Sequence, residues 1–244
     1  MPRSTLCRSA AALALFLGLG FATGCRSTAA DVPLGEERIA EAQAALGKPM
    51  SGDMAALYHL RIPSSGGLRL SVVQLESSGR LTVSDQFGAM ISLVTWGNAG
   101  GTRFYDMREG CRIRGGDLSS ILGVSAMPPP QVVRLLGGRL PASGGDLVSP
   151  TDDGRMTVVG DDWSATVTVM PDPWRIVAVD GPARSGAGGW RIRLKQHSGS
   201  LPGWIRVDDG DGRWAELELT GLEWDTLSEL PAVPSLPVCG VTAD

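Results

Sequence analysis

The side chains best suited to chemistry are few, and their spacing builds no familiar catalytic set. Histidine occurs only at His59 and His197, in neither case with metal-ligand spacing, and no GxSxG or HExxH sequence is present. Acidic residues gather in residues 208–213, but Gly210 stands where a calcium loop needs an acidic residue. A hairpin turn is the favoured interpretation of that cluster. We therefore expect a protein that is not an enzyme and that carries no cofactor or metal.

The four cysteines divide into two groups by position. Cys7 and Cys25 belong to the N-terminal segment, which leaves Cys111 and Cys239 for the folded part. A metal or redox pair is one alternative for these two, but neither has a CxxC spacing or further ligands nearby. Two cysteines in an oxidising compartment form a stable disulfide instead. The sequence therefore predicts a structural Cys111–Cys239 disulfide.

The N-terminal segment has the three parts of an export signal. Arg3 and Arg8 supply positive charge, and residues 10–21 follow as an apolar run of 12 residues without a charge. Such a run is too short for a membrane-spanning helix, which needs about 20 residues. It suits the core of a signal peptide, with the small residues 22–24 just after it. We expect the chain to leave the cytoplasm.

The residues Ala22, Thr23, Gly24 and Cys25 resemble the lipobox of bacterial lipoproteins. The resemblance implies transfer of diacylglycerol to the Cys25 sulfur, cleavage after Gly24 and acylation of the new amino terminus. An ordinary secretory signal with a chance cysteine is the alternative. Two or three acyl chains anchor a protein stably, whereas one binds only marginally. Because Arg26 rather than Asp follows the cysteine, the resemblance implies the outer membrane, facing the periplasm, in a host with two membranes.

Periodicity divides the remaining chain into an N-terminal helix and a long series of strands. Residues 36–46 have charge in their first turn and an apolar face, and they predict a helix. From residue 57 onward the period becomes two, most clearly in residues 190–195, where apolar and basic residues alternate. About ten strands are expected, including residues 68–75 (with a one-residue slip at Val72 and Val73), 163–169 and 215–219. Such alternation is typical of antiparallel strands with one apolar face.

Two short helices are expected to interrupt the strands, at residues 117–123 and 128–137. Residues 230–240 are too rich in proline for a central strand and should run extended over the surface, held by Cys239. The apolar face of so long a sheet has to be covered, by closure into a barrel or by helices. The sequence therefore predicts a mainly β fold with helices (α+β), a curved, unclosed antiparallel barrel capped by short helices on its concave face.

The expected organisation has four parts. Residues 1–24 are the lipoprotein signal peptide, and residues 25–50 are the anchor, tether and first helix. Residues 51–229 form the half-barrel with its helical insertion at 117–137, and residues 230–244 form the proline-rich tail. The formal net charge is −4 and no basic run occurs, so nucleic acid is not expected as a partner. We expect a monomer.

Three segments carry a resemblance to a known family. Residues 81–93 resemble the strand, polar turn and strand of the outer-membrane lipoprotein receptor LolB and its relatives. Residues 121–137 resemble the helical insertion of that family, and residues 201–207 with 217–219 resemble its closing hairpin. The order and spacing of these segments resemble the family over most of residues 57–224. Departures are the additional cysteine pair, the proline-rich tail and glycine-rich turns such as residues 185–189.

The resemblance implies an apolar cavity for acyl chains. Each buried CH₂ contributes ~0.8 kcal/mol, so an apolar lining alone is enough to hold a chain. The residues expected to line the cavity are Leu70, Val72, Leu81, Val83, Met90, Leu93, Leu118, Ile121, Leu122, Val132, Val133, Leu136, Trp163 and Val167. The same residues would also build an ordinary core, and periodicity does not separate the two.

The resemblance also implies a task and a membrane-contacting residue. The family accepts lipoproteins from a soluble periplasmic carrier protein and places them in the outer membrane. The apolar residue of its polar turn protrudes and helps insertion, and the matching position is Phe87. Phe87 can alternatively fold back onto the barrel rim, as aromatic residues beside turns often do.

The sequence is compatible with three functions. The first is a carrier of lipids or lipoproteins, with acyl chains as its ligand and a soluble carrier as its partner. The second is a structural or assembly lipoprotein of the envelope that uses the barrel as a protein-binding platform. The third is an envelope hydrolase, which the absence of a catalytic motif disfavours.

The lipobox interpretation predicts the behaviour of one substitution. Cys25→Ser should leave the chain without lipid, because the thiol that accepts diacylglycerol is gone, and the chain should remain uncleaved or be released. Membrane fractionation and incorporation of labelled palmitate measure this. Cys7→Ser is the control and should behave as the unaltered chain. Unchanged palmitate labelling of the Cys25→Ser chain would contradict the lipobox.

Overall fold

The computed structural model describes residues 34–50, 52–63, 65–97, 101–115, 127–183, 189–226, 229–230, 232–233 and 235–240. From Pro33 onward the chain forms one compact unit. The signal peptide, Cys25 and the helix expected at residues 117–123 lie outside the described residues. None of the helices within these ranges is long and apolar enough to cross a bilayer.

Thirteen antiparallel strands form a single sheet. They are β1 (Met54–Arg61), β2 (Leu68–Leu75), β3 (Ser78–Ser84), β4 (Met90–Trp96), β5 (Arg103–Asp106), β6 (Cys111–Ile113), β7 (Leu147–Pro150), β8 (Met156–Val159), β9 (Ser164–Met170), β10 (Arg175–Ala183), β11 (Gly189–Lys195), β12 (Trp204–Asp208) and β13 (Trp214–Trp224). Their order is β6-β5-β4-β3-β2-β1-β13-β12-β11-β10-β9-β8-β7. The expected fold class, an unclosed antiparallel sheet with short helices, is confirmed.

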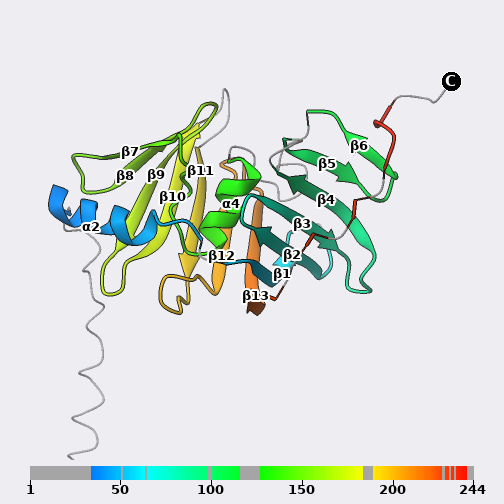
Figure 1. The fold of residues 1–244 in the computed structure, drawn as a ribbon, viewed down its shortest axis with the longest axis horizontal. Helices are drawn as coiled ribbons and strands as arrows, with labels where there is room; N and C mark the ends of the chain where they lie inside the picture. The colour runs from blue at the N-terminus through cyan, green and yellow to red at the C-terminus, as the bar shows by residue number, and fades with distance from the viewer. Residues whose placement is uncertain are drawn as a thin grey trace, which may run out of the picture. The chain divides into compact units, whose positions relative to one another are not determined.

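The topology consists of two meanders joined at the middle of the sheet. The first and last strands, β1 and β13, pair along their length and connect the two halves. The chain therefore ends its first meander at one edge, β6, and begins its second at the opposite edge, β7. The segment between them has to cross the sheet, and it carries the helix α4 (Pro129–Leu136). Figure 1 shows α4 over the middle of the sheet and α2 (Glu36–Leu46) across its β7 end.

Most strand boundaries agree with the alternation in the sequence, with two differences. The one-residue slip expected at Val72 and Val73 is wrong, because β2 pairs with β1 and with β3 in continuous register there. The sheet also has more strands than the ten expected. Strands β5 to β8 are only three or four residues long, which is too short for alternation to reveal them.

The helix α2 is confirmed at the predicted residues. Glu36 and Glu37 lie in its first turn, where carboxylates interact favourably with the helix dipole. Gly47 ends the helix, and Ile39, Ala42 and Leu46 are buried against the sheet. The last turn contains no basic residue of its own. Its carbonyl groups therefore need partners from elsewhere in the fold.

The second predicted helix is confirmed as α4. It begins with prolines in its first turn and ends at Gly137. Gly138 follows with a positive φ of 70°. A Cβ atom at this position would lie 2.3 Å from the Ser200 carbonyl oxygen, so only glycine permits the approach to the β11–β12 loop. This contact fixes α4 against the second meander.

The main core lies between the helices and one face of the sheet. Along β1 the buried residues are Met54, Ala56, Tyr58 and Leu60, every second position. The same alternation continues in the other strands, and the helices add their apolar residues to the same cluster. Tyr58 lies at the centre of the sheet, and its hydroxyl donates to the Leu136 carbonyl of α4 at 3.5 Å. Burial raises the pKa of the Tyr58 hydroxyl, so the group remains protonated.

The C-terminal tail closes one edge of the sheet. Val238 bridges Arg112 of β6 in parallel, the Arg112 amide donates to the Pro237 carbonyl, and the Cys239 amide donates to the Arg112 carbonyl. The predicted disulfide is present, with Cys111 and Cys239 Cα atoms 5.0 Å apart. Figure 1 shows the tail in red reaching β6. The edge amides of β6 are thus paired rather than exposed to another chain.

The tail pairing predicts a stability effect. The disulfide joins residues 128 positions apart, and closing so long a loop constrains the unfolded chain. The Cys111→Ala, Cys239→Ala double variant should therefore lose about 2–4 kcal/mol of unfolding free energy. Urea denaturation measures the loss. Reductant should lower the stability of the unaltered chain by a similar amount and leave the double variant unchanged. Equal stabilities of the oxidised and double-variant chains would contradict the prediction.

Candidate functional site

Two arginines join α2 to α4: Arg134 lies in the last turn of α4, and Arg139 follows the helix. Arg134 Nε donates to the Leu140 carbonyl at 2.9 Å, and its Nη2 donates to the Gly47 carbonyl at 3.3 Å. Arg139 donates to the Ala45 carbonyl at 3.1 Å, and the Leu140 amide donates to the Leu46 carbonyl. The C-terminal carbonyls of α2 thus obtain positive partners from the α4 segment. Burial lowers the pKa of Arg134 below the usual arginine value.

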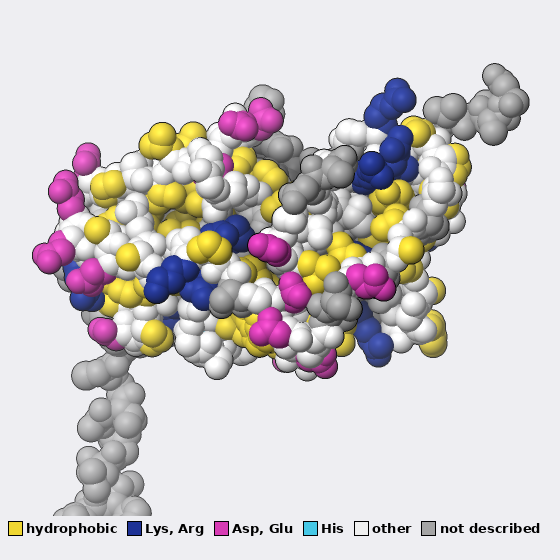
Figure 2. Space-filling view, in the orientation of Figure 1, with side chains coloured by type: hydrophobic (Ala, Val, Ile, Leu, Met, Phe, Trp, Pro, Cys, Tyr) yellow, Lys and Arg dark blue, Asp and Glu magenta, His cyan; other side chains and the backbone are white. Residues whose placement is uncertain are grey.

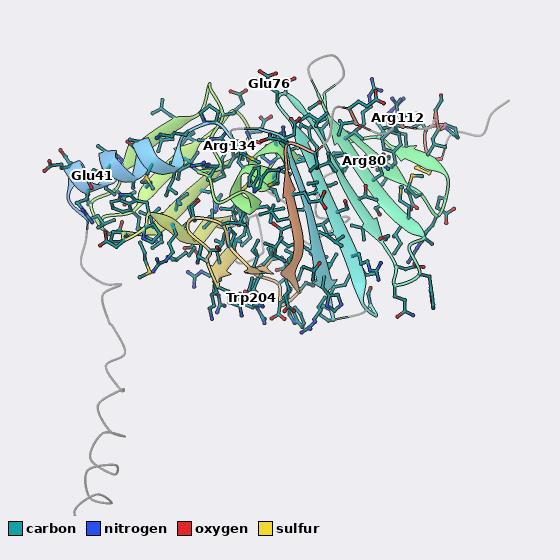
Figure 3. The ribbon with its side chains drawn as sticks, turned by 60° about the horizontal axis from the view of Figure 1, so that its bottom comes forward. Glu41, Glu76, Arg80, Arg112, Arg134 and Trp204 are labelled. Atoms are coloured by element: carbon teal, nitrogen blue, oxygen red, sulfur yellow. A yellow bond between two sulfur atoms is a disulfide. The ribbon has the colours of Figure 1, made fainter. Side chains whose placement is uncertain are left out.

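The guanidinium groups of Arg134 and Arg139 lie where the end of α2 meets the α4 segment. Figure 3 labels Arg134 where α2 and α4 meet, and Figure 2 shows basic side chains gathered beside these helices near the middle of the face. A groove of about 390 Å³ lies at this junction, lined among others by Gln43, Pro49, Arg134 and Asp146. None of the residues predicted to line the acyl cavity borders it.

The predicted lining residues that the structure describes are mostly core residues. Leu70, Val72, Leu81, Val83, Val133, Leu136 and Val167 belong to the main buried cluster, and Val132 and Trp163 pack against it half-buried. They lie on the helix-covered face, as expected for one apolar surface. Leu118, Ile121 and Leu122 lie outside the described residues. The acyl cavity itself stays a prediction, and the nine residues named above form part of one apolar surface beneath α2 and α4.

Leu93 is a correction to that list. Its strand partners are Thr82 and Tyr105, whereas the core residues Leu81 and Val94 pair with each other one position away. Leu93 is buried on the opposite face of the sheet, where the row continues through Tyr105 and Arg112 to Val238 of the tail. Leu93 is apolar like the core residues, but its position in the alternation places it on the other side of the sheet, so its expected place in the cavity lining is wrong.

Met90 also departs from the expected lining. A register shift lies between Val83 and Ser84, where Ser84 pairs with Met90. The Met90 sulfur lies 3.8 Å from Arg80 Nη2. Arg80 is buried and its Nε donates to Thr82 on the face away from the main core. Met90 therefore contacts a buried guanidinium, which an apolar cavity would not present.

Phe87 is the most exposed large apolar residue among those described, with 86% of its surface accessible. It lies on the turn between β3 and β4. Asp85 Oδ1 accepts the Phe87 amide at 2.8 Å and the Ala89 amide at 2.9 Å, and the Gly88 amide donates to the Asp85 carbonyl. Gly88 adopts the left-handed φ of 87° that this turn requires. The turn is therefore rigid and presents Phe87 outward instead of folding it onto the rim.

A second groove, of about 550 Å³, lies beside this turn on the face opposite the helices. Its walls come from β1, β2 and β13 and include Leu57, His59, Arg69 and Thr220, with Gln86 of the turn closing one side. Sequence reasoning missed this groove. Arg69 and His59 were identifiable as outward residues from the alternation, but their proximity depends on strand pairing.

The other polar candidates have structural roles. Asp209 Oδ1 accepts the amides of Asp211 and Arg213, which confirms the hairpin turn at residues 208–213. His197 lies 2.8 Å from the Ile176 carbonyl, to which its ring N–H donates, and burial lowers the pKa of His197. Within the described ranges, no group of three or more His, Cys, Asp or Glu side chains could hold a metal ion.

The fold is similar to that of solved structures. A LolA superfamily protein, NE2245 from Nitrosomonas europaea, matches with a TM-score of 0.51 and 12% identity, over 80% of this chain and 94% of that chain. An uncharacterized conserved protein from Thermus thermophilus matches more weakly, with a TM-score of 0.41 and 10% identity, over 82% of this chain and 98% of that chain. No protein-family model and no curated protein sequence matches. The chain therefore has a LolA-like fold.

The helix junction predicts a stability effect of Arg134. Arg134→Met keeps most of the aliphatic length but removes the donors to the part-buried Leu140 carbonyl and to the exposed Gly47 carbonyl, and it leaves the Leu140 carbonyl without a partner. The unfolding free energy should fall by about 2–3 kcal/mol. Urea denaturation is the measurement. The control Arg61→Met removes only an exposed 3.7 Å ion pair with Glu218 and should cost about 0.5 kcal/mol or less. Equal losses in the two variants would refute the capping role.

Proposed function

We propose that the protein is an envelope lipoprotein that binds acyl chains of lipids or lipoproteins beneath its helices and delivers them to a membrane. The LolA-like fold supports the carrier class, although a fold alone does not assign a function. The observation that carries the proposal is the outward Phe87 on a rigid turn of that fold. An anchor on Cys25 would keep the chain at the outer membrane, facing the periplasm.

The interior is suited to chains without polar specificity. Along β1 the side chains that face the helices are apolar except for the Tyr58 hydroxyl, which donates to α4, and Trp190, Ile192 and Leu194 of β11 add further large apolar side chains. An acyl chain would enter by displacing α2 or α4, since both pack on this surface. Their junction combines hydrogen bonds from Arg134 and Arg139 with the buried side chains of Leu46 and Leu140. Displacing a helix would expose this apolar surface, and a bound acyl chain would cover it again.

Phe87 supplies the membrane contact in this proposal. Transfer of an exposed phenylalanine from water into an apolar phase is worth about 2 kcal/mol, enough for transient contact and too little for anchoring. The turn needs no reorganisation to present the ring, because Asp85 already fixes the backbone on both sides of it. A soluble periplasmic carrier protein would be the donor of cargo.

Phe87→Glu tests the membrane contact. The variant should retain its melting temperature within about 2 °C, because surface substitutions outside packed regions change stability little. It should deliver a bound lipoprotein to liposomes about ten-fold more slowly, since the inserting apolar surface is lost. The assay uses the Cys25→Ser chain in its released form without the signal peptide, so that neither an anchor nor the apolar residues 10–21 mask the contact. A large loss of stability, or transfer at the unaltered rate, would remove Phe87 from this role.

A protein-binding platform is the second candidate, favoured by a different surface. Leu147 of β7 and Val159 of β8 are strand partners and are 67% and 45% exposed. Leu147→Glu makes the same change of chemistry as Phe87→Glu at a distant exposed position. Leu147→Glu is therefore the matched control for Phe87→Glu, and in the carrier proposal it should leave the rate of transfer to liposomes unchanged. Loss of activity only in Leu147→Glu would favour the platform.

Mass spectrometry of lipid that copurifies with the chain tests acyl binding directly.

A further inference from the structure

The groove beside the Phe87 turn has the composition of a binding site for an anionic group. Two of its residues, His59 and Arg69, are basic, and none is acidic, in a chain whose net charge is −4. His59 and Arg69 are direct cross-strand partners, which places their side chains side by side on one face. The guanidinium of Arg69 makes no ion pair with any described residue. The nearest strand acid, Glu218, lies opposite His59 but is ion-paired with Arg61.

The backbone around the groove is irregular in a way that keeps it open. A bulge in β13 inserts Thr220 opposite Leu57, and the Thr220 hydroxyl donates to the Leu57 carbonyl at 3.0 Å. The second register shift of this region lies at Ser84, which is the strand partner of Arg69. Gly67 also contributes, because a Cβ atom there would lie only 3.1 Å from His59 Nε2. Bulges of this kind commonly re-aim side chains beside binding sites.

The groove adjoins the turn that carries Phe87, the residue proposed to contact the membrane. Gln86, which closes one side, immediately precedes Phe87 on the same rigid turn. If the Phe87 ring enters the acyl layer, the adjoining groove lies in the headgroup layer, which is about 5–8 Å thick on each side of a bilayer. The exposed Leu57 side chain adds an apolar wall next to the basic pair.

We propose that this groove binds the phosphate of an anionic phospholipid headgroup, with Arg69 as the main contact and His59 beside it. The inference rests on the proposed membrane contact of Phe87 and gives that contact a lipid preference. Arginine pairs with phosphate through two parallel hydrogen bonds, a geometry that a single exposed guanidinium can offer. A zwitterionic headgroup fits less well, because its ammonium group would find no carboxylate among the groove residues.

Arg69→Gln tests the proposal in the same released Cys25→Ser chain without the signal peptide. Binding is measured by flotation with vesicles of pure phosphatidylcholine and with vesicles containing phosphatidylglycerol. One basic residue lost near an anionic membrane should weaken binding about five-fold. This loss is expected only for the vesicles with phosphatidylglycerol and should shrink at high salt. The control Arg103→Gln removes the same charge from an exposed position on β5, at the end of the sheet away from the Phe87 turn, and should bind as the unaltered chain.

The outcomes separate the headgroup site from the membrane contact. Phe87→Glu should weaken binding to both kinds of vesicle, whereas Arg69→Gln should affect only the anionic ones. Equal binding by Arg69→Gln and Arg103→Gln would overturn the headgroup site and leave the role of Phe87 intact. If Arg69→Gln weakens vesicle binding while Phe87→Glu binds normally, the headgroup site is supported and the inserting role of the Phe87 turn is rejected. Glycerol phosphate can also be added as a soluble competitor. If millimolar glycerol phosphate displaces the protein from anionic vesicles as strongly as added anionic lipid does, the groove binds free phosphate, and the lipid assignment is overturned.

Discussion

The fold depends on covering one apolar face of a sheet that does not close. Because β6 and β7 lie at opposite edges, the connection between them has to cross the whole sheet, and this chain places α4 on that crossing. The crossing segment then holds α2 through Arg134 and Arg139, which pair with the carbonyls at the end of α2. A single topological constraint therefore accounts for the cover of the core and for the docking of the N-terminal helix.

The two edges of the sheet are protected by different means. The tail pairs its backbone with β6 and is fixed by the disulfide. At the other edge β7 has only four residues and contains Pro150, while Gln43 of α2 donates to the Val148 carbonyl at 3.4 Å. A short strand, a proline and a side-chain partner all reduce pairing with other chains. The sheet can thus stay open at both ends without forming an aggregation-prone edge.

The features assigned to function lie apart from those that maintain stability. Phe87 and Arg69 are exposed, on the rim turn and on the face opposite the helices, and neither belongs to the main core. The turn is rigid because Asp85 satisfies its amides, so it can present an aromatic ring without support from the core. In the proposed function, membrane contact would use the rim turn and the face opposite the helices, whereas cargo would lie on the helix-covered face, so the two could be altered independently.

The sequence by itself determined the fold class, both described helices, the longer strands and the disulfide, because these follow from local periodicity, end signals and cysteine counting. Only the tertiary structure decided the face on which Leu93 lies, the partners of Arg134 and the groove around Arg69. Each of these depends on the register between strands or helices far apart in the chain. Alternation tells which residues share a face of one strand, but a bulge such as that at Thr220 changes the register and leaves no mark on the local pattern.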